Sequence, residues 1–125
     1  MNAQRNREIA QRYWQSLGKR DWAAFRETLA EDVLYEVPQT RERVRGLEAY
    51  VDFNATFPGD WTIEVVRLVA DETGASGQIV FRHQGQEQVG IAFLQMADGK
   101  IQHIFDFWPE PYEPPLRMSR YVERY

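Results

Sequence analysis

Residues 12–38 read RYWQSLGKRDWAAFRETLAEDVLYEVP and predict two helices followed by a strand. The first helix, expected over residues 3–18, has one apolar stripe at spacings of three and four: Ile9, Ala10, Tyr13, Trp14 and Leu17. Gly18 can end this helix, and Asp21 is placed to cap a second, short helix. Residues 30–38 then alternate as a strand, which Pro38 stops.

The rest of the chain predicts one more helix and four more strands. Gly46 precedes a helix over residues 47–57, which is ended by a Pro-Gly pair. Strands are expected over residues 61–70, 77–83, 89–96 and 100–108, the last three joined by tight hairpins. Broken alternation at Val65-Val66 indicates a bulge in the first of these strands. Helices early and strands late predict an α+β fold whose bulged sheet curves around the helices and leaves a pocket.

Composition bounds the class of protein. A chain of 125 residues forms one domain, 1–125, and 43% hydrophobic residues fit a globular core. The chain has no cysteine and no apolar run of the ~20 residues that a membrane span needs. A net charge of −4 without a basic excess argues against nucleic acid as a partner. We therefore expect a soluble, cytoplasmic protein with neither a nucleic-acid nor a membrane partner.

Three segments in order carry a resemblance to a known family: residues 12–38, RGLEAYVDF at 45–53, and DGKIQHIFDFW at 98–108. Together they resemble the nuclear transport factor 2-like superfamily, in particular its SnoaL-like, polyketide cyclase-like branch, over nearly the whole chain. The resemblance implies a cone-shaped α+β fold, with a curved antiparallel sheet around N-terminal helices, an apolar cavity and often a homodimer through the sheet. This fold hosts isomerases, dehydratases, epoxide hydrolases, cyclases and binding modules, so several chemistries stay open.

Site patterns within the superfamily favour some of these chemistries over others. By resemblance, Tyr13 stands where the steroid isomerases keep an oxyanion-hole tyrosine. Their general-base aspartate falls on Val37 and their second acid near Ala92, so ketosteroid isomerase chemistry is not expected. Asp106 matches the last member of the Arg–Asp–Asp set of the epoxide hydrolases, but the strand that should carry the others reads IVFRH, so that match is incomplete. It best fits the acid/base aspartate of the SnoaL-like cyclases.

Asp106 is the first candidate for chemistry on the residues themselves. Strand alternation gives it one face with Gln102, Ile104 and Trp108. If that face lines the cone, burial among aromatic rings raises the pKa of the carboxyl, and the acid can donate or accept a proton near neutrality. The alternative is a structural acid paired with an arginine or a backbone donor.

Three further residues are weaker candidates for catalysis. Tyr13 is either a core tyrosine or a hydrogen-bond donor to substrate. His83 is either a base or a buried structural histidine, and Glu36 becomes a second acid only if it faces the cavity with Leu34. Neither His83 nor His103 has metal-ligand spacing with a nearby acid, so no metal and no cofactor are expected.

Binding candidates come from the aromatic residues and from one arginine cluster. Most of the aromatic set is core, but some of it must shape any pocket: Trp14, Tyr50, Phe53 and Trp108. In TRERVRG, Arg43 belongs either to a solvated loop with Glu42 as partner or to an anchor for a substrate carboxylate or phosphate. The proline-rich tail, 109–125, is expected to cross the cone mouth or a partner subunit.

The sequence therefore predicts a SnoaL-like protein that takes a small, mostly apolar organic ligand and forms a homodimer. The chemistry it suggests is cofactor-independent isomerisation, dehydration or cyclisation, with Asp106 as acid/base, Tyr13 as donor, and Glu36 and His83 as secondary candidates. The alternative is a non-catalytic ligand-binding or dimeric interaction module. Whether the protein is an enzyme stays open at this point.

Overall fold

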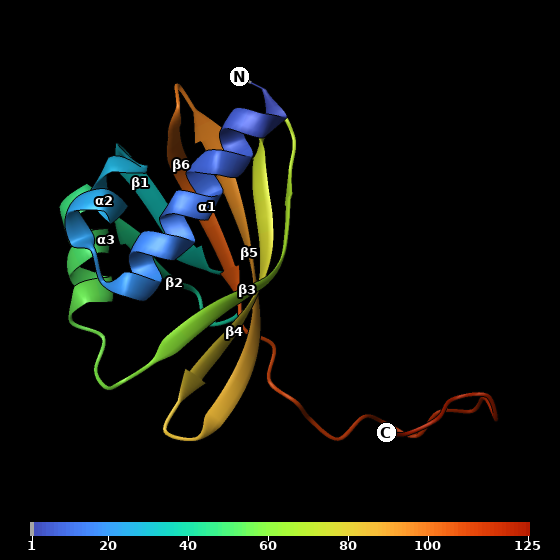
Figure 1. The fold of residues 1–125 in the computed structure, drawn as a ribbon. Coiled ribbons are helices and arrows are strands. Elements are labelled where there is room, and N and C mark those ends of the chain that lie inside the picture. The colour runs from blue at the N-terminus through green and yellow to red at the C-terminus, as the bar shows by residue number, and fades with distance from the viewer. Residues whose placement is uncertain (1) are drawn as a thin grey trace.

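A computed structural model describes residues 2–125, and its helices pack against the concave face of one curved, unclosed sheet (Figure 1). The helices are α1 (Ala3–Lys19), α2 (Trp22–Glu27) and α3 (Leu47–Ala55). The strands are β1 (Leu29–Val37), β2 (Glu42–Arg45), β3 (Thr62–Ala70), β4 (Gly74–His83), β5 (Gln86–Ala97) and β6 (Lys100–Phe107). This arrangement confirms the α+β fold predicted from the sequence.

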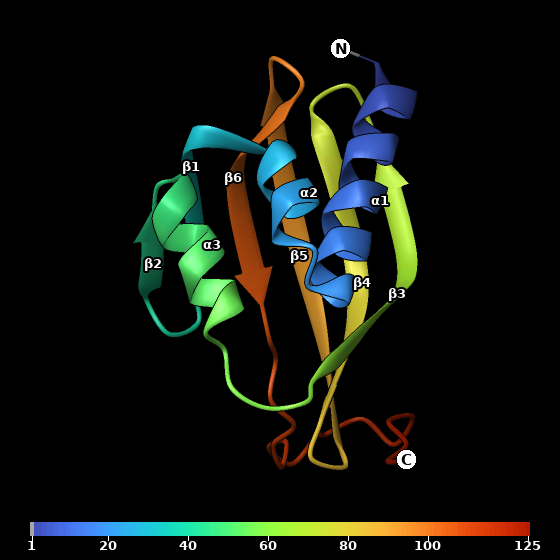
Figure 2. The same cartoon turned by 60° about the vertical axis from the view of Figure 1, so that its left-hand side comes forward.

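The sheet has the strand order β2-β1-β6-β5-β4-β3. Strands β3 to β6 form the predicted antiparallel meander. β1 pairs with β6 in parallel and lies between β6 and the edge strand β2. Figure 2 shows α1 lying over the β3 and β4 side of the sheet, α2 over its middle, and α3 over the β1 side.

Three local features differ from the sequence prediction. The TRERVRG segment, expected as a loop, contains the edge strand β2, which pairs antiparallel with β1. Its alternating Glu-Arg-Val-Arg pattern suits a short edge strand, where charged side chains face solvent. Helix α1 ends one residue after Gly18, and Arg20 takes the left-handed conformation (φ 57°) that closes it. Gly18 instead lies in the helix, close to Ile63.

The predicted Asp21 cap and the predicted bulge are present. The Asp21 carboxylate accepts a hydrogen bond from the Ala24 N–H at 3.2 Å and so satisfies one free donor of α2. The β3–β4 register shifts between Val65 and Arg67, where the alternation breaks. Such a bulge bends the strand and increases its twist, which helps the sheet to curve around the helices.

The core fills one end of the curved sheet and leaves the other end open. Phe25, Val33, Ile101 and Ile104 have no exposed surface, and the inner stripe of α1 packs against them. Burial of each such side chain stabilises the folded state by about 1.5–3 kcal/mol relative to leaving it exposed to water. Beyond this packed end, the wide end of the sheet is lined by larger rings that do not fill the space, and the pocket described below lies there.

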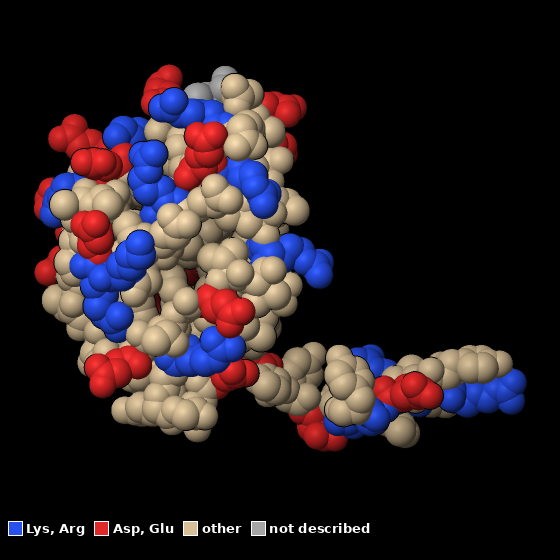
Figure 3. Space-filling view, viewed as in Figure 1, with Lys and Arg blue, Asp and Glu red and all other residues tan. Residues whose placement is uncertain are grey.

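The tail after β6 lies away from the rest of the chain. Residues 109–125 form no helix or strand, and the tail, red in Figure 1, projects from the end of β6 into solvent in Figures 1 and 3. Only Glu110 of this segment lines the pocket, so the tail does not cover the mouth of its own cone. None of the described helices is long and apolar enough to cross a membrane.

Candidate functional site

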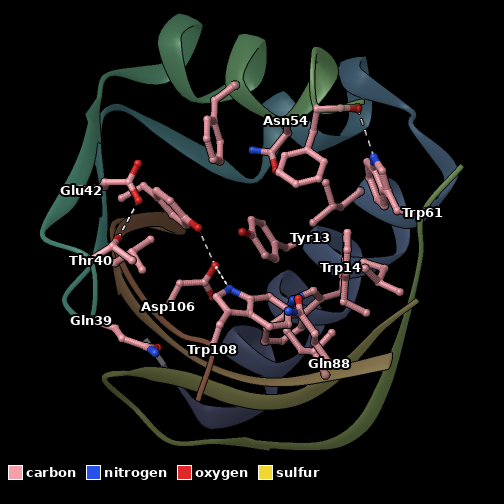
Figure 4. A pocket seen from close by; sticks show the side chains of 18 of the residues that line it. Tyr13, Trp14, Gln39, Thr40, Glu42, Asn54, Trp61, Gln88, Asp106 and Trp108 are labelled. Carbon is pink, nitrogen blue, oxygen red and sulfur yellow. Dashed lines mark hydrogen bonds between the residues drawn. The ribbon is translucent and has the colours of Figure 1, made fainter. Parts of the chain in front are cut away.

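A pocket of about 310 Å³ opens at the wide end of the sheet (Figure 4). Its walls come from α1, β1, β2, α3, the α3–β3 loop and the inner face of β3 to β6. Aromatic side chains dominate the lining: Tyr13, Trp14, Tyr35, Phe53, Phe57, Trp61, Phe81 and Trp108. A volume of this size and an apolar wall with few polar groups are typical of small-molecule sites.

Asp106 is the most buried of the carboxyl residues that line this pocket. Its Oδ2 accepts a hydrogen bond from the Tyr35 hydroxyl at 2.6 Å and one from the Trp108 indole N–H at 3.1 Å. No described residue donates to Oδ1, and Oδ1 is not among the buried atoms without a partner. The carboxyl is therefore held through one oxygen while the other remains accessible from the cavity.

Burial raises the pKa of Asp106 above its usual value of 3.8, and the two hydrogen bonds from Tyr35 and Trp108 offset only part of that effect. No Lys or Arg pairs with it among the described residues. The arrangement is therefore an acid in an aromatic environment rather than one half of an ion pair.

Two buried tyrosines lie next to this acid. The hydroxyls of Tyr13 and Tyr50 are 2.6 Å apart, and either one can be the donor. Burial raises the pKa of Tyr13, and the charges of Tyr50 and Asp106 raise it further. Burial and Asp106 also raise the pKa of Tyr35 and of Tyr50. All three phenols consequently stay protonated at neutral pH and can donate hydrogen bonds.

The structure brings five of the residues suggested by the sequence to the pocket wall: Asp106, Tyr13, Trp14, Phe53 and Trp108. Tyr50 lies directly behind the wall, bonded to Tyr13. The strand face that carries Asp106 and Trp108, which the sequence left open, therefore lines the pocket.

Glu36 and Arg43 lie elsewhere, on the outer face of the sheet. Tyr35 points inward, so its neighbour Glu36 points outward and does not meet the condition for a second acid in the cavity. The Glu36 carboxylate accepts from Arg43 Nη2 at 2.6 Å and lies 2.7 Å from His103 Nε2. These two partners lower the pKa of Glu36.

His83 lies on the inner face of β4 but beyond the pocket lining. Its Nε2 is buried without a hydrogen-bond partner among the described residues. A Cβ added at Gly59 would be 2.0 Å from this nitrogen, so the loop backbone packs directly on the imidazole. This packing suits a structural histidine.

Two residues important to the site were not suggested by the sequence. Tyr35 is the closest donor to Asp106, and its position on the apolar face of its strand was the available signal, because a buried hydroxyl needs a partner. Glu42 lines the pocket from β2, where its Oε1 accepts from the Thr40 hydroxyl at 2.6 Å. That strand has only four residues, so its alternation could not be told from a loop in the sequence.

No group of three or more acidic or histidine side chains among residues 2–125 is arranged to hold a metal ion. The lining contains carboxyl, hydroxyl, amide and indole groups. These groups can position an organic molecule and exchange a proton with it.

Comparisons with known proteins give the family. Residues 10–104 match the family described as the SnoaL-like domain. Among curated proteins, no sequence matches. A crystal structure of a candidate ketosteroid isomerase from Kribbella flavida DSM 17836 is 41% identical, with a TM-score of 0.94, covering 98% of this chain and 91% of that one.

Two more distant structures share the fold. An epoxide hydrolase of M. tuberculosis, described as LEH-like, has 15% identity and a TM-score of 0.74, covering 86% of this chain and 84% of that one. A candidate polyketide cyclase from Xanthomonas campestris pv. campestris has 22% identity and a TM-score of 0.71, covering 87% and 93% respectively. With its family match, its fold and this 41% identical relative, the chain belongs to the SnoaL-like branch of the nuclear transport factor 2-like superfamily.

Proposed function

We propose that this protein binds a small, largely apolar organic molecule and moves a proton on it, in an isomerisation, dehydration or cyclisation that needs no cofactor. The observation that carries the proposal is the environment of Asp106. One carboxyl oxygen is anchored by Tyr35 and Trp108, and the other is accessible from an aromatic cavity. Perturbed acids in clefts are frequent at catalytic sites.

The raised pKa of Asp106 suits it to transfer in either direction. In the protonated form the carboxyl can donate to a carbonyl oxygen or a leaving hydroxyl. In the ionised form it can take a proton from a carbon next to a carbonyl group. A pKa above its usual value increases the protonated fraction near neutrality and makes the remaining carboxylate a stronger base.

Tyr13 supplies the second part of the proposal. If the Tyr50 hydroxyl donates to Tyr13, the proton of Tyr13 is free to point at a substrate oxygen in the pocket. A protonated phenol in a dry site stabilises the negative charge that develops on such an oxygen. We assign no step to Glu36, Arg43 or His83, because none of them lines the pocket.

The second candidate is a non-catalytic ligand-binding module. Its support is the hydrogen bond between the hydroxyls of Tyr13 and Tyr50. If Tyr13 is the donor of this bond, its proton is already used and cannot be donated to a substrate. The 41% identical relative is described as a candidate ketosteroid isomerase, which favours the enzymatic reading for this chain. The two candidates differ in whether a bound carbonyl compound exchanges protons.

The test is deuterium exchange into small cyclic and aryl ketones, followed by ¹H NMR in D₂O. We expect the wild-type protein to speed exchange next to the carbonyl group, and Asp106→Asn to reduce that rate by about 10²–10⁴-fold. Tyr13→Phe should reduce it less, and Glu36→Gln, a carboxyl variant on the outer face, should leave it unchanged. Full exchange by Asp106→Asn would overturn the catalytic proposal; binding without any exchange would favour the binding module.

We further propose that the chain forms a homodimer through the outer face of its sheet, with residues 109–125 on the partner subunit. The outer face carries apolar side chains 40–57% exposed on β3 and β5: Val69, Val89, Ile91 and Phe93. The tail carries others that are 78–95% exposed: Tyr112, Leu116, Met118 and Tyr121. Large exposed apolar sets of this kind mark interaction surfaces.

A further inference from the structure

The pocket has an unusual balance of charge. Three carboxyl side chains line it, namely Glu42, Asp106 and Glu110, while no Lys, Arg or His does. The pocket therefore presents acidic groups to a ligand without any basic group to neutralise them.

The same three carboxyls take no part in an ion pair among residues 2–125. Carboxylates elsewhere on the surface do: Glu36, Glu48, Glu64, Glu87 and Glu113 each lie within 4.0 Å of an arginine. Arginines are thus available across the fold, but none neutralises the pocket. Figure 4 shows Glu42 and Asp106 on the same side of the cavity. Besides burial, the charges of Asp106 and, to a smaller extent, Glu42 raise the pKa of Tyr35.

The aromatic wall adds a second, independent preference for positive charge. A ring face carries partial negative charge and attracts a cation within about 6 Å of its centroid, most strongly when the site is dry. One ring of the pocket wall already makes this interaction, because the Arg20 guanidinium lies 3.9 Å from the centroid of the Trp61 ring. Arg20 also donates to the Trp61 carbonyl at 2.8 Å and is not part of the pocket lining.

We propose that the natural ligand of this pocket is an apolar organic cation, a protonated amine or quaternary ammonium compound of one or two rings. Its apolar body packs against the rings, and its positive charge lies among the aromatic faces beside Asp106 and Glu42. A cavity of about 310 Å³ limits its size. The absence of a basic group in the lining disfavours carboxylates and phosphates, which need donors such as arginine.

This inference names the substrate class of the proposed function and uses the same pocket. It does not depend on proton transfer, since binding alone would reveal the charge preference. An organic cation also fits the enzymatic proposal, because the positive charge can hold a substrate while Asp106 exchanges a proton at a neighbouring carbon. The two proposals can consequently fail separately.

The test compares three probes of nearly equal shape and different charge. Benzyltrimethylammonium is the cation, neopentylbenzene is its neutral carbon isostere, and phenylmethanesulfonate is the anion. Binding is measured by ligand-observed NMR and by quenching of tryptophan fluorescence, since Trp14, Trp61 and Trp108 line the pocket. We expect the cation to bind about tenfold more tightly than the isostere, and the sulfonate not to bind.

Variants assign the preference to the pocket carboxyls. Glu42→Gln keeps an acceptor for the Thr40 hydroxyl but removes the charge, and we expect it to weaken binding of the cation about three- to tenfold. Its affinity for neopentylbenzene should not change, which also shows that the variant is folded. Glu48→Gln is the matched control, because Glu48 pairs with Arg26 outside the pocket.

Three results would overturn the inference: no binding of benzyltrimethylammonium, equal binding of the neutral isostere, or binding of the sulfonate as tight as that of the cation. Ketone exchange without a charge preference would leave the proposed function standing and remove this inference. A charge preference without ketone exchange would support this inference and remove the proposed proton transfer.

Discussion

Gly90 lies directly against the indole ring of Trp108: a Cβ added at position 90 would be 2.5 Å from Cζ3 of that ring. No side chain fits between β5 and the ring, so the glycine lets Trp108 lie flat on the sheet. From there its N–H reaches Asp106 at 3.1 Å. A backbone position on one strand therefore fixes the donor to the carboxyl on the next strand.

Gly90→Ala should displace Trp108 and break its hydrogen bond to Asp106. We expect the free energy of unfolding to fall by about 1–3 kcal/mol, as in other overpacked sites, and ligand binding to weaken. Denaturant unfolding measures the first effect. If the clash is the cause, Gly90→Ala/Trp108→Ala is no less stable than Trp108→Ala alone; additive losses in the double mutant would refute this explanation.

Asp106→Asn should make the protein more stable at neutral pH. Burial raises the folded-state pKa of Asp106 above its unfolded value, so the native state binds more protons than the unfolded state between those two pKa values. The contribution of Asp106 to stability is therefore fully present below the unfolded pKa, near 4, and is lost as pH rises through the folded pKa. Asparagine does not titrate, and so escapes this loss.

The measurement is the difference in unfolding free energy between Asp106→Asn and wild type from pH 4 to pH 8. We expect the difference to favour the variant at pH 8 and to shrink toward pH 4. A variant that is less stable by a constant amount across the range would contradict the raised pKa.

Glu36→Gln should show the opposite dependence on pH. Arg43 and His103 lower the pKa of Glu36, so its contribution to stability is present above the unfolded pKa and is lost as pH falls through the folded value. The variant should be less stable than wild type at pH 7, and the two should converge in acid. Thermal unfolding at several pH values checks this. Because Glu36 lies on the outer face of the sheet, the Glu36→Gln variant should bind ligand as tightly as the wild-type protein does.

Removal of residues 109–125 should weaken the homodimer without unfolding the domain. These residues make no helix or strand, and their apolar side chains are exposed in the isolated chain. We expect full-length protein to sediment as a dimer. The dimer of the chain ending at Trp108 should dissociate into monomers at a higher protein concentration than the full-length dimer does. A full-length monomer at all concentrations would contradict both the dimer and the role of the tail.

The sequence predicts which residues share a strand face with Asp106, but not its hydrogen-bond partners. Alternation along a single strand places Asp106 and Trp108 on one face, which is local information. The donor Tyr35 lies 71 residues away and reaches Asp106 only because β1 joins β6 in parallel at the centre of the sheet. Such long-range pairing is not encoded in the periodicity of either strand.

The same limit explains why Glu42, and not the predicted Glu36, lines the pocket. Alternation separates Tyr35 from Glu36 but does not say which of the two faces the cone, and the packing of α3 over β1 decides it. Glu42 comes from a strand of four residues, too short for a periodic signal to stand out from a loop. Edge elements of this kind are fixed by pairing with β1 rather than by their own sequence.

Tyr35→Phe should shift the titration of Asp106 to higher pH. The Tyr35 hydroxyl donates to Oδ2 and stabilises the carboxylate, so this bond lowers the pKa of Asp106 against the larger effect of burial. Without the hydroxyl, burial acts with less compensation and the pKa rises further. Carbon-13 NMR of the labelled aspartate carboxyls follows this titration directly, and Asp106→Asn identifies the resonance.

The ring of Tyr35 packs with its centroid 4.8 Å from that of Tyr50, and phenylalanine preserves this contact. The Tyr35→Phe variant should therefore keep the fold, and its free energy of unfolding should fall by about 1.5–3 kcal/mol at neutral pH. An unchanged or lower pKa in Tyr35→Phe would mean that the hydroxyl does not stabilise the ionised form, and the acid would then owe its state to burial and Trp108 alone.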